Sequence, residues 1–147
     1  MYLKTFKLFL PIWVLILAAL ACGGSEPVTM DSLPVFDGAV ILESGQSTVA
    51  EAVVEALKQT AGQEGVTAET RIYGVPAGTT WDAIKSFYAS HLGEGWTEDA
   101  QLSEAQEGFN TAGWTRGGLA SEQAVVAALV NDPFAGQDFL ILVLFSE

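Results

Sequence analysis

Two apolar stretches decide the fold of this 147-residue chain: Ala124-Val125-Val126-Ala127-Ala128-Leu129-Val130 and Phe139-Leu140-Ile141-Leu142-Val143-Leu144-Phe145. Both have the length and the branched or aromatic content of β-strands, and the turn-prone residues 131–138 separate them. An antiparallel hairpin with a longish loop is therefore predicted. Strands with one wet face alternate apolar and polar residues. Neither stretch contains a polar residue, so both faces of the hairpin must be covered.

The cover can come from inside the chain, as one helix on each face or as the segment 33–42 folded over the sheet. Monomers rarely leave large apolar patches exposed, which favours this explanation. If both helices instead lie on one face, the other face is a candidate interface for a second copy or for another protein. Successive strand residues point to opposite faces. The candidate interface residues are Leu140, Leu142 and Leu144 on one face and Ile141 and Val143 on the other.

Two amphipathic helices are predicted before the strands, over residues 47–61 and 79–92. Capping boxes open them, Thr48 with Glu51 and Thr79 with Asp82. Gly62 and Gly93 are the expected stops. The second helix has an aromatic stripe at helical spacing, which can line a ligand pocket but is expected to form core. The residues of this stripe are Trp81, Ile84, Phe87, Tyr88 and Leu92.

Short strands are expected elsewhere in the chain. The segments 39–42 and 66–75 flank the first helix, and 96–102 and 109–115 precede the terminal hairpin. The predicted order is β-α-β-α-β-β-β-β. The sequence thus predicts an α+β fold in which two helices pack on a mainly antiparallel sheet of five to six strands.

The beginning of the chain has the three parts of an export signal. Lys4 and Lys7 precede the apolar run 8–20, and small residues surround the Ala21-Cys22 bond. The run is shorter than the roughly 20 residues that a bilayer-spanning helix needs. It also contains Pro11. A permanent transmembrane helix is the weaker interpretation.

The tetrapeptide Ala19-Leu20-Ala21-Cys22 resembles the lipobox of bacterial lipoprotein precursors. The resemblance implies that Cys22 receives a diacylglyceryl group and becomes the new N-terminus. The alternative is that Cys22 is simply an apolar residue of an ordinary signal peptide. Several acyl chains would anchor the protein durably, since each buried methylene contributes about 0.8 kcal/mol.

Three parts are expected: the signal peptide over 1–21 that the resemblance implies, a flexible lipid-anchored tether over 22–32 indicated by its small and polar residues, and a single α+β domain over 33–147 of ordinary domain size. The resemblance covers only about the first 25 residues. It places the domain outside the cytoplasmic membrane, in the cell envelope. Phe87-Tyr88, Leu92 and Gly95-Trp96 also form a pattern that resembles small uncharacterised envelope lipoproteins. If one face of the hairpin is open, an envelope protein is a possible partner there. That pattern implies no activity.

The charge of the chain limits its partners. After Cys22, 18 acidic residues face only Lys58, Arg71, Lys85 and Arg116, a formal charge of −14. Nucleic-acid binding needs basic patches, so no nucleic-acid partner is expected. The same charge disfavours adhesion to anionic lipid headgroups. A lipid on Cys22 is then the expected membrane attachment.

No catalytic residue, cofactor or metal site is predicted. His91 is the only histidine, and its place in the last turn of the second predicted helix favours a structural role. Cys22 is the only cysteine, so no intramolecular disulfide can form. Asn131, Asp132 and Asp138 could offer oxygen ligands to calcium, but their spacing fits no calcium loop and a plain turn is favoured.

Two functions from different classes fit these features. The first is a non-catalytic, lipid-anchored binding or accessory module of the cell envelope. The second is a small-molecule binder or hydrolase that uses acidic residues in a pocket. The missing histidine and nucleophile motifs favour the first.

Overall fold

The computed structural model describes residues 26–118 and 121–147, which form one antiparallel sheet with a helix on each side. The helices are α2 (Thr48–Glu64) and α3 (Trp81–His91), preceded by the short 3-10 helix η1 (Met30–Ser32). The strands are β1 (Val40–Ile41), β2 (Thr67–Gly74), β3 (Thr97–Gln106), β4 (Phe109–Gly118), β5 (Ser121–Asp132) and β6 (Gln137–Ser146). The predicted α+β class and the order β-α-β-α-β-β-β-β are confirmed.

The two apolar strands β5 and β6 lie in the middle of the sheet, whose order is β1-β2-β6-β5-β4-β3. Neighbouring strands β3 to β6 pair as hairpins, whereas the β2–β6 pairing joins distant parts of the sequence. The β5–β6 ladder continues to the pair Asp132 and Gln137. The turn therefore comprises only residues 133–136, and the expected longish loop is wrong because its flanking residues extend the two strands.

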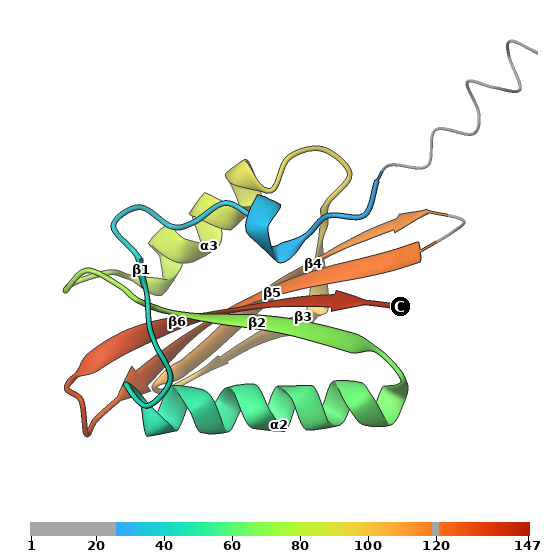
Figure 1. Ribbon diagram of the computed structural model, residues 1–147. Helices are drawn as coiled ribbons and strands as arrows, with labels where there is room; N and C mark the ends of the chain where they lie inside the picture. Colours follow the sequence, from blue (N-terminus) through green and yellow to red (C-terminus); the bar gives the residue numbers. More distant parts are fainter. Residues whose placement is uncertain (1–25, 119–120) are drawn as a thin grey trace, which may run out of the picture.

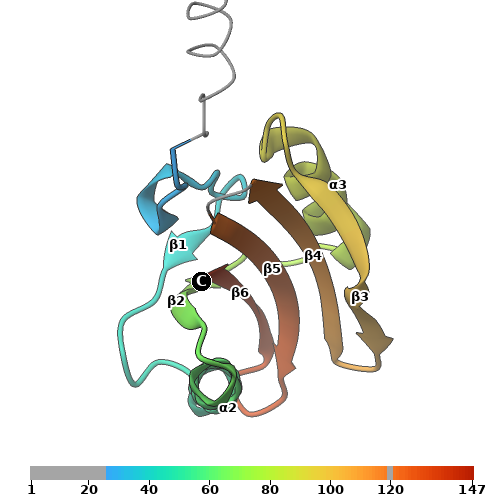
Figure 2. The same ribbon diagram turned by 90° about the vertical axis from the view of Figure 1, so that its right-hand side faces the viewer.

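The two helices cover opposite faces of the sheet (Figures 1 and 2). Helix α3 and the segment 28–39 pack on the face that includes Leu140, Leu142 and Leu144. Helix α2 packs on the face that includes Ile141 and Val143. All five of these side chains are at most 2 % exposed. The chain itself therefore covers both faces of the hairpin. The five candidate interface residues lie in the interior, where they offer no open contact surface.

The aromatic stripe of α3 belongs to the core, but its residues are buried to different degrees. Ile84 and Tyr88 are fully buried. Trp81, Phe87 and Leu92 are partly buried and pack against the same cluster. Phe87 packs edge-on against Phe36 at 5.4 Å between ring centroids, so the segment before β1 covers it.

The helix ends differ from the predicted ones. Ser47, rather than Thr48, caps α2, and its side chain accepts a hydrogen bond from the Ala50 amide at 3.1 Å. Helix α2 continues through Gly62 and ends at Gly65, because Gly65 adopts the left-handed conformation (φ 76°) that closes the last turn. Thr80, rather than Thr79, caps α3 by accepting from Ala83.

Packing begins earlier in the chain than the expected domain start at residue 33. Met30 and Leu33 are 4 % and 5 % exposed and belong to the core under α3. Val28 is held by two hydrogen bonds to Gln123, each 2.8 Å long. The segment 28–32, assigned to the tether, is therefore part of the folded domain. Among the described residues, no helix is long and apolar enough to span a membrane.

Candidate functional site

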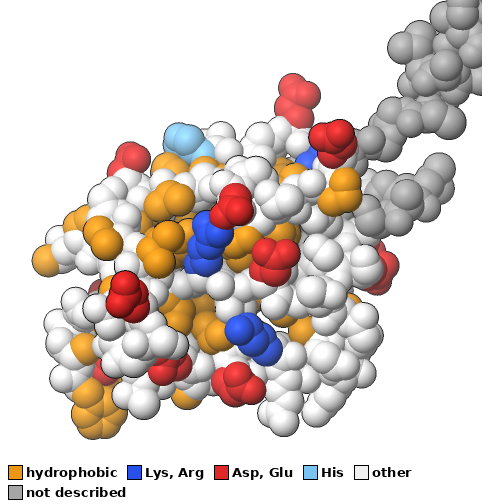
Figure 3. All heavy atoms as spheres, in the orientation of Figure 1, with side chains coloured by type: hydrophobic (Ala, Val, Ile, Leu, Met, Phe, Trp, Pro, Cys, Tyr) orange, Lys and Arg blue, Asp and Glu red, His pale blue; other side chains and the backbone are white. Residues whose placement is uncertain are grey.

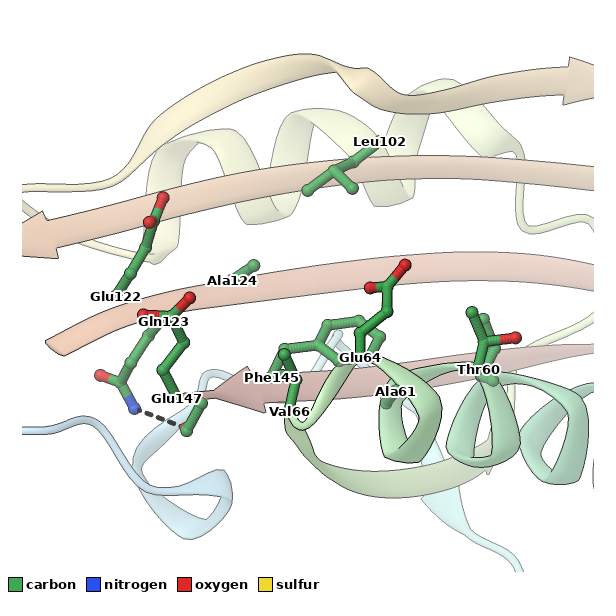
Figure 4. A pocket seen from close by; sticks show the side chains of 12 residues that line it. Thr60, Ala61, Glu64, Val66, Leu102, Glu122, Gln123, Ala124, Phe145 and Glu147 are labelled. Carbon is green, nitrogen blue, oxygen red and sulfur yellow. Dashed lines mark hydrogen bonds between the residues drawn. The ribbon is translucent and has the colours of Figure 1, made fainter.

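A mainly apolar cavity lies between the C-terminal half of α2 and the sheet (Figure 4). It has a volume of about 270 Å³. Sites for drug-sized ligands typically measure roughly 300–1,000 Å³, so this cavity is just below that range. Its walls are mainly apolar. They comprise Leu57 and Ala61 of α2, Val66 after the helix, Leu102 of β3, Ala124 of β5 and Phe145 of β6.

The cavity exists because small residues meet where α2 leaves the sheet partly uncovered. Helix α2 packs mainly against β2, with fewer contacts to β6 and β5. Ala61 and Ala124 leave room beside Phe145, and Figure 4 labels these three lining residues on α2, β5 and β6. At either alanine, a larger side chain would reduce the space.

The far wall is made by a β-bulge in β3. The pairing of β3 with β4 shifts register between Asp99 and Glu104. This irregularity places Leu102 directly over Gly113, which has no side chain to obstruct it. Leu102 thereby packs against the cluster under α2 and closes one side of the cavity.

The cavity carries three carboxylates and no basic side chain. Glu64, Glu122 and Glu147 line it, and all three are exposed to solvent. Over residues 26–118 and 121–147, the ion pairs are Arg71 with Asp31 and Lys85 with Glu98, so these three glutamates have no cationic partner there. The site thus combines an apolar interior with an unneutralised negative rim.

The cavity lies at the end of the domain from which the N-terminal segment leaves. Gln123, one of its lining residues, accepts a hydrogen bond from the Val28 amide and donates one to the Val28 carbonyl. The same side-chain amide donates to Ser146 Oγ at 3.2 Å, drawn as a dashed line in Figure 4. Figure 2 shows this end of the molecule, with the C-terminus and the end of α2 toward the viewer.

A second hollow of about 500 Å³ lies between α2 and the β1–β2 edge of the sheet. Side chains of both charge signs line this hollow. Lys58 and Arg71 are basic, and Glu51 and Glu55 are acidic. Arg71 is already paired with Asp31, an interaction that raises the pKa of its guanidinium. Figure 3 shows this face, where carboxylates are scattered and apolar side chains lie between them. Its mixed lining gives it no clear ligand preference.

The three residues considered for calcium lie at the facing ends of β5 and β6, and Asp132 caps the turn between these strands. Asp132 Oδ1 accepts hydrogen bonds from the Phe134 and Ala135 amides, and its Oδ2 accepts from Ser47 Oγ at 2.8 Å. Burial alone would raise the pKa of Asp132, but the hydrogen bonds from Ala135, Ser47 and Phe134 outweigh it and hold the pKa below 3.8. This carboxylate joins the start of α2 to the β5–β6 turn.

Neither the histidine nor the buried tyrosine of α3 forms a reactive centre. The His91 ring stacks on Phe87, and its Nδ1 lies 2.8 Å from the Phe87 carbonyl oxygen. Burial raises the pKa of Tyr88, and the nearby Tyr73 raises it further by a smaller amount. The backbone of Phe36 lowers this pKa, but by less than burial raises it. The Tyr88 hydroxyl has no partner with hydrogen-bonding geometry among the described residues. It lies in the core rather than in a cavity.

Of the residues that the sequence singled out, the structure brings together Asn131 and Asp138, which pair across β5 and β6, with Asn131 Nδ2 donating to Asp138 Oδ1 at 2.7 Å. Cys22 lies outside the described residues. The five hairpin residues are interior. Within the part of the chain that the structure describes, no group of three or more His, Cys, Asp or Glu side chains could hold a metal ion.

Sequence reasoning missed the cavity altogether. Its lining comes from α2, β3, β5 and β6, so no contiguous pattern marks it. Ala61 and Ala124 gave no usable signal, because α2 and β5 contain several other alanines. Comparison with known proteins adds no assignment, since the chain matches no family model, no curated protein and no solved structure.

Proposed function

We propose that this protein is a lipid-anchored, extracytoplasmic and non-catalytic binding module of the cell envelope. The export-signal pattern and the tetrapeptide ending at Cys22 support the location. The cavity between α2 and the sheet supports binding, because its interior is apolar and its rim is acidic. Apolar pockets with a few polar groups are the usual form of small-ligand sites.

The tetrapeptide ending at Cys22 carries the anchoring proposal, and the short spacing after it decides how the domain would be held. Val28 lies six positions after Cys22 and is fixed to the sheet by Gln123. An extended chain covers about 3.3–3.6 Å per residue, so this span reaches about 20 Å. A lipid on Cys22 would therefore keep the cavity end of the domain close to the bilayer.

Replacing Cys22 tests the anchor. The full chain and its Cys22→Ser variant are expressed in a bacterial host, the cells are fractionated, and the protein is weighed by mass spectrometry. The wild-type chain should be in the membrane fraction with the mass of a processed, acylated cysteine, and protease should reach it from outside the cytoplasmic membrane. The variant should lose the added mass, whereas the neighbouring Ser25→Ala should behave as wild type. Equal membrane retention and equal mass for both variants would refute the anchor.

The second candidate, a small-molecule binder or hydrolase using acidic residues, gains support for its binding half only. Acid/base hydrolysis needs two carboxyl groups held in fixed positions around a substrate. The side chains of Glu64, Glu122 and Glu147 are exposed, and no hydrogen bond among the described residues fixes them. The geometry therefore favours holding a ligand over cleaving one.

A further inference from the structure

We infer that the cavity between α2 and the sheet binds a small molecule with an apolar body and one ammonium group. This inference deepens the proposed binding function and rests on it for the choice of site. It concerns the ligand class, whereas lipid anchoring concerns where the domain is held. The two can therefore fail separately.

The apolar body follows from the walls of the cavity. Leu57, Leu102 and Phe145 are only partly buried although they surround a common space. A ligand that filled this space would remove their remaining surface from water, and each Å² of apolar area so buried contributes about 25 cal/mol. Ala61, at 4 % exposure, forms a smooth part of the wall without a polar side-chain atom.

The size of the cavity limits the ligand. Its volume of about 270 Å³ is small for a ligand site. Because drug-sized molecules occupy larger pockets, one short aliphatic chain or one aromatic ring fits better than a larger body.

The single positive charge of the ligand follows from the acidic residues at the rim of the cavity. Glu64 extends from the last turn of α2, while Glu122 and Glu147 come from the strand ends across the opening (Figure 4). No lysine or arginine lines the cavity within the described part of the chain. An ammonium group at the opening would have carboxylates on more than one side, whereas a carboxylate or phosphate would meet like charges.

The test compares three probes with one carbon skeleton: n-hexylammonium, hexan-1-ol and hexanoate. Binding to the full chain is measured by isothermal titration calorimetry. If the chain is membrane-bound, it is reconstituted in phosphatidylcholine nanodiscs, and empty nanodiscs provide the blank. Hexylammonium should bind with the highest affinity, hexanol more weakly and hexanoate not at all. Absence of heat with hexylammonium at two well-separated temperatures, or equal affinity for hexanol, would overturn the inference, because apolar binding that is heatless at one temperature gives heat at another.

Matched variants locate the binding. The double variant Glu64→Gln and Glu122→Gln should bind hexylammonium about 2- to 30-fold more weakly, the range for two partly exposed ion pairs. The double variant Glu94→Gln and Glu107→Gln removes the same charge from loops outside the cavity and should keep wild-type affinity. An equal loss in both would mean that the general acidity of the protein attracts the probe, and the site would be rejected.

Filling the cavity gives an independent check. Ala124→Leu should abolish binding of both hexylammonium and hexanol, whereas Ala56→Leu, on the exposed side of α2, should not. If Ala124→Leu does not fold, the glutamate variants still decide the outcome, because their exposed side chains are not needed for packing. If Cys22 proves to be unmodified, the same titrations are run on the chain without nanodiscs, so a failed anchor leaves the ligand test intact.

Discussion

Gly113 shows how a single residue shapes the cavity. It lies in β4 beneath the β3 bulge, and a Cβ atom added there would lie 2.7 Å from Leu102 Cδ1 and closer still to Leu102 Cβ. Its φ is not positive, so the constraint is space and not backbone conformation. Glycine in a strand otherwise lowers stability, by roughly 0.5–1 kcal/mol relative to alanine.

Gly113→Ala should therefore destabilise the fold, by about 1–3 kcal/mol, because the new methyl group displaces Leu102 from its packing. Gly117→Ala is the matched control in the same strand, where the nearest atom, Glu122 Cγ, would be 3.9 Å away. It should be neutral or slightly stabilising. Urea unfolding of the full chain measures both, and a stabilised Gly113→Ala would show that Leu102 does not occupy this place.

Asp132 gives the fold a defined response to acid. Its pKa in the folded state lies below the usual 3.8, since the hydrogen bonds to the carboxylate outweigh burial. The carboxylate thus stabilises the fold above pH 3.8, and this contribution is lost as the pH falls through the folded-state pKa. Between about pH 4 and about pH 2, the free energy of unfolding of Asp132→Asn should fall less than that of wild type. Asp37→Asn, in an exposed loop, should follow the wild-type curve, and a wild-type slope for Asp132→Asn would contradict this role.

Residue-level contacts of this kind were beyond the sequence. The pattern around Trp96–Leu102 predicted a strand, but nothing in it showed that Leu102 would cross over Gly113 at a bulge. Ser47 and Thr48 are both acceptable caps by residue type, and serine is the more common of the two. Ser47 is the cap in the structure, where its hydroxyl also donates a hydrogen bond to Asp132, a residue far away in the sequence.

At the scale of elements, Gln123 attaches the N-terminal segment to the sheet. It makes hydrogen bonds to both backbone groups of Val28 and is 6 % exposed. Gln123→Ala should release the segment 28–33 and cost about 1–3 kcal/mol, the usual effect of leaving buried polar groups without partners. Hydrogen exchange at the Val28 amide should accelerate strongly in the variant.

Gln101→Ala, an exposed glutamine of β3, is the control for Gln123→Ala and should leave the Val28 exchange rate unchanged. Unchanged protection at Val28 in Gln123→Ala would mean that Met30 and Leu33 hold the segment without the hydrogen bonds.

The elements themselves were largely predictable because their signals are local. Apolar periodicity predicted both helices, and strand-type composition between turn residues predicted the six strands, with ends shifted by a few residues. The stop at Gly62 was misjudged because glycine is tolerated inside a helix when a better cap, here Gly65, follows within one turn. The segment 28–32 was missed because Gln123, which fixes it, lies near the other end of the chain.

At the scale of the molecule, the purely apolar hairpin required cover on two sides, and the fold provides it with one helix on each side. The sequence established this need but not which helix covers which face. Which helix covers which face depends on the pairing of β2 with β6, two strands that are far apart in the sequence. This pairing fixes the place of β2 in the sheet, and with it the places of α2 before the strand and α3 after it. The cavity follows from the same arrangement, since α2 covers its face incompletely.

Charged substitutions in β6 test the two-sided cover. Leu142 faces α3 and Ile141 faces α2, and both are fully buried. A lysine at either position would bury an ammonium group without a partner, which should cost at least about 4 kcal/mol. That is a large part of the roughly 5–15 kcal/mol that stabilises a typical domain. Leu142→Lys and Ile141→Lys should therefore both lose the near-UV circular dichroism of a packed core.

Val40, in the edge strand β1, is the control position for these two lysine variants because its side chain is 66 % exposed. Substitutions at exposed surface positions usually change stability by less than about 0.5 kcal/mol, and the same is expected for Val40→Lys. Its near-UV spectrum should match that of wild type, since no core side chain is displaced. A variant at 141 or 142 that kept its packed core would show that the helix on that side does not cover the sheet.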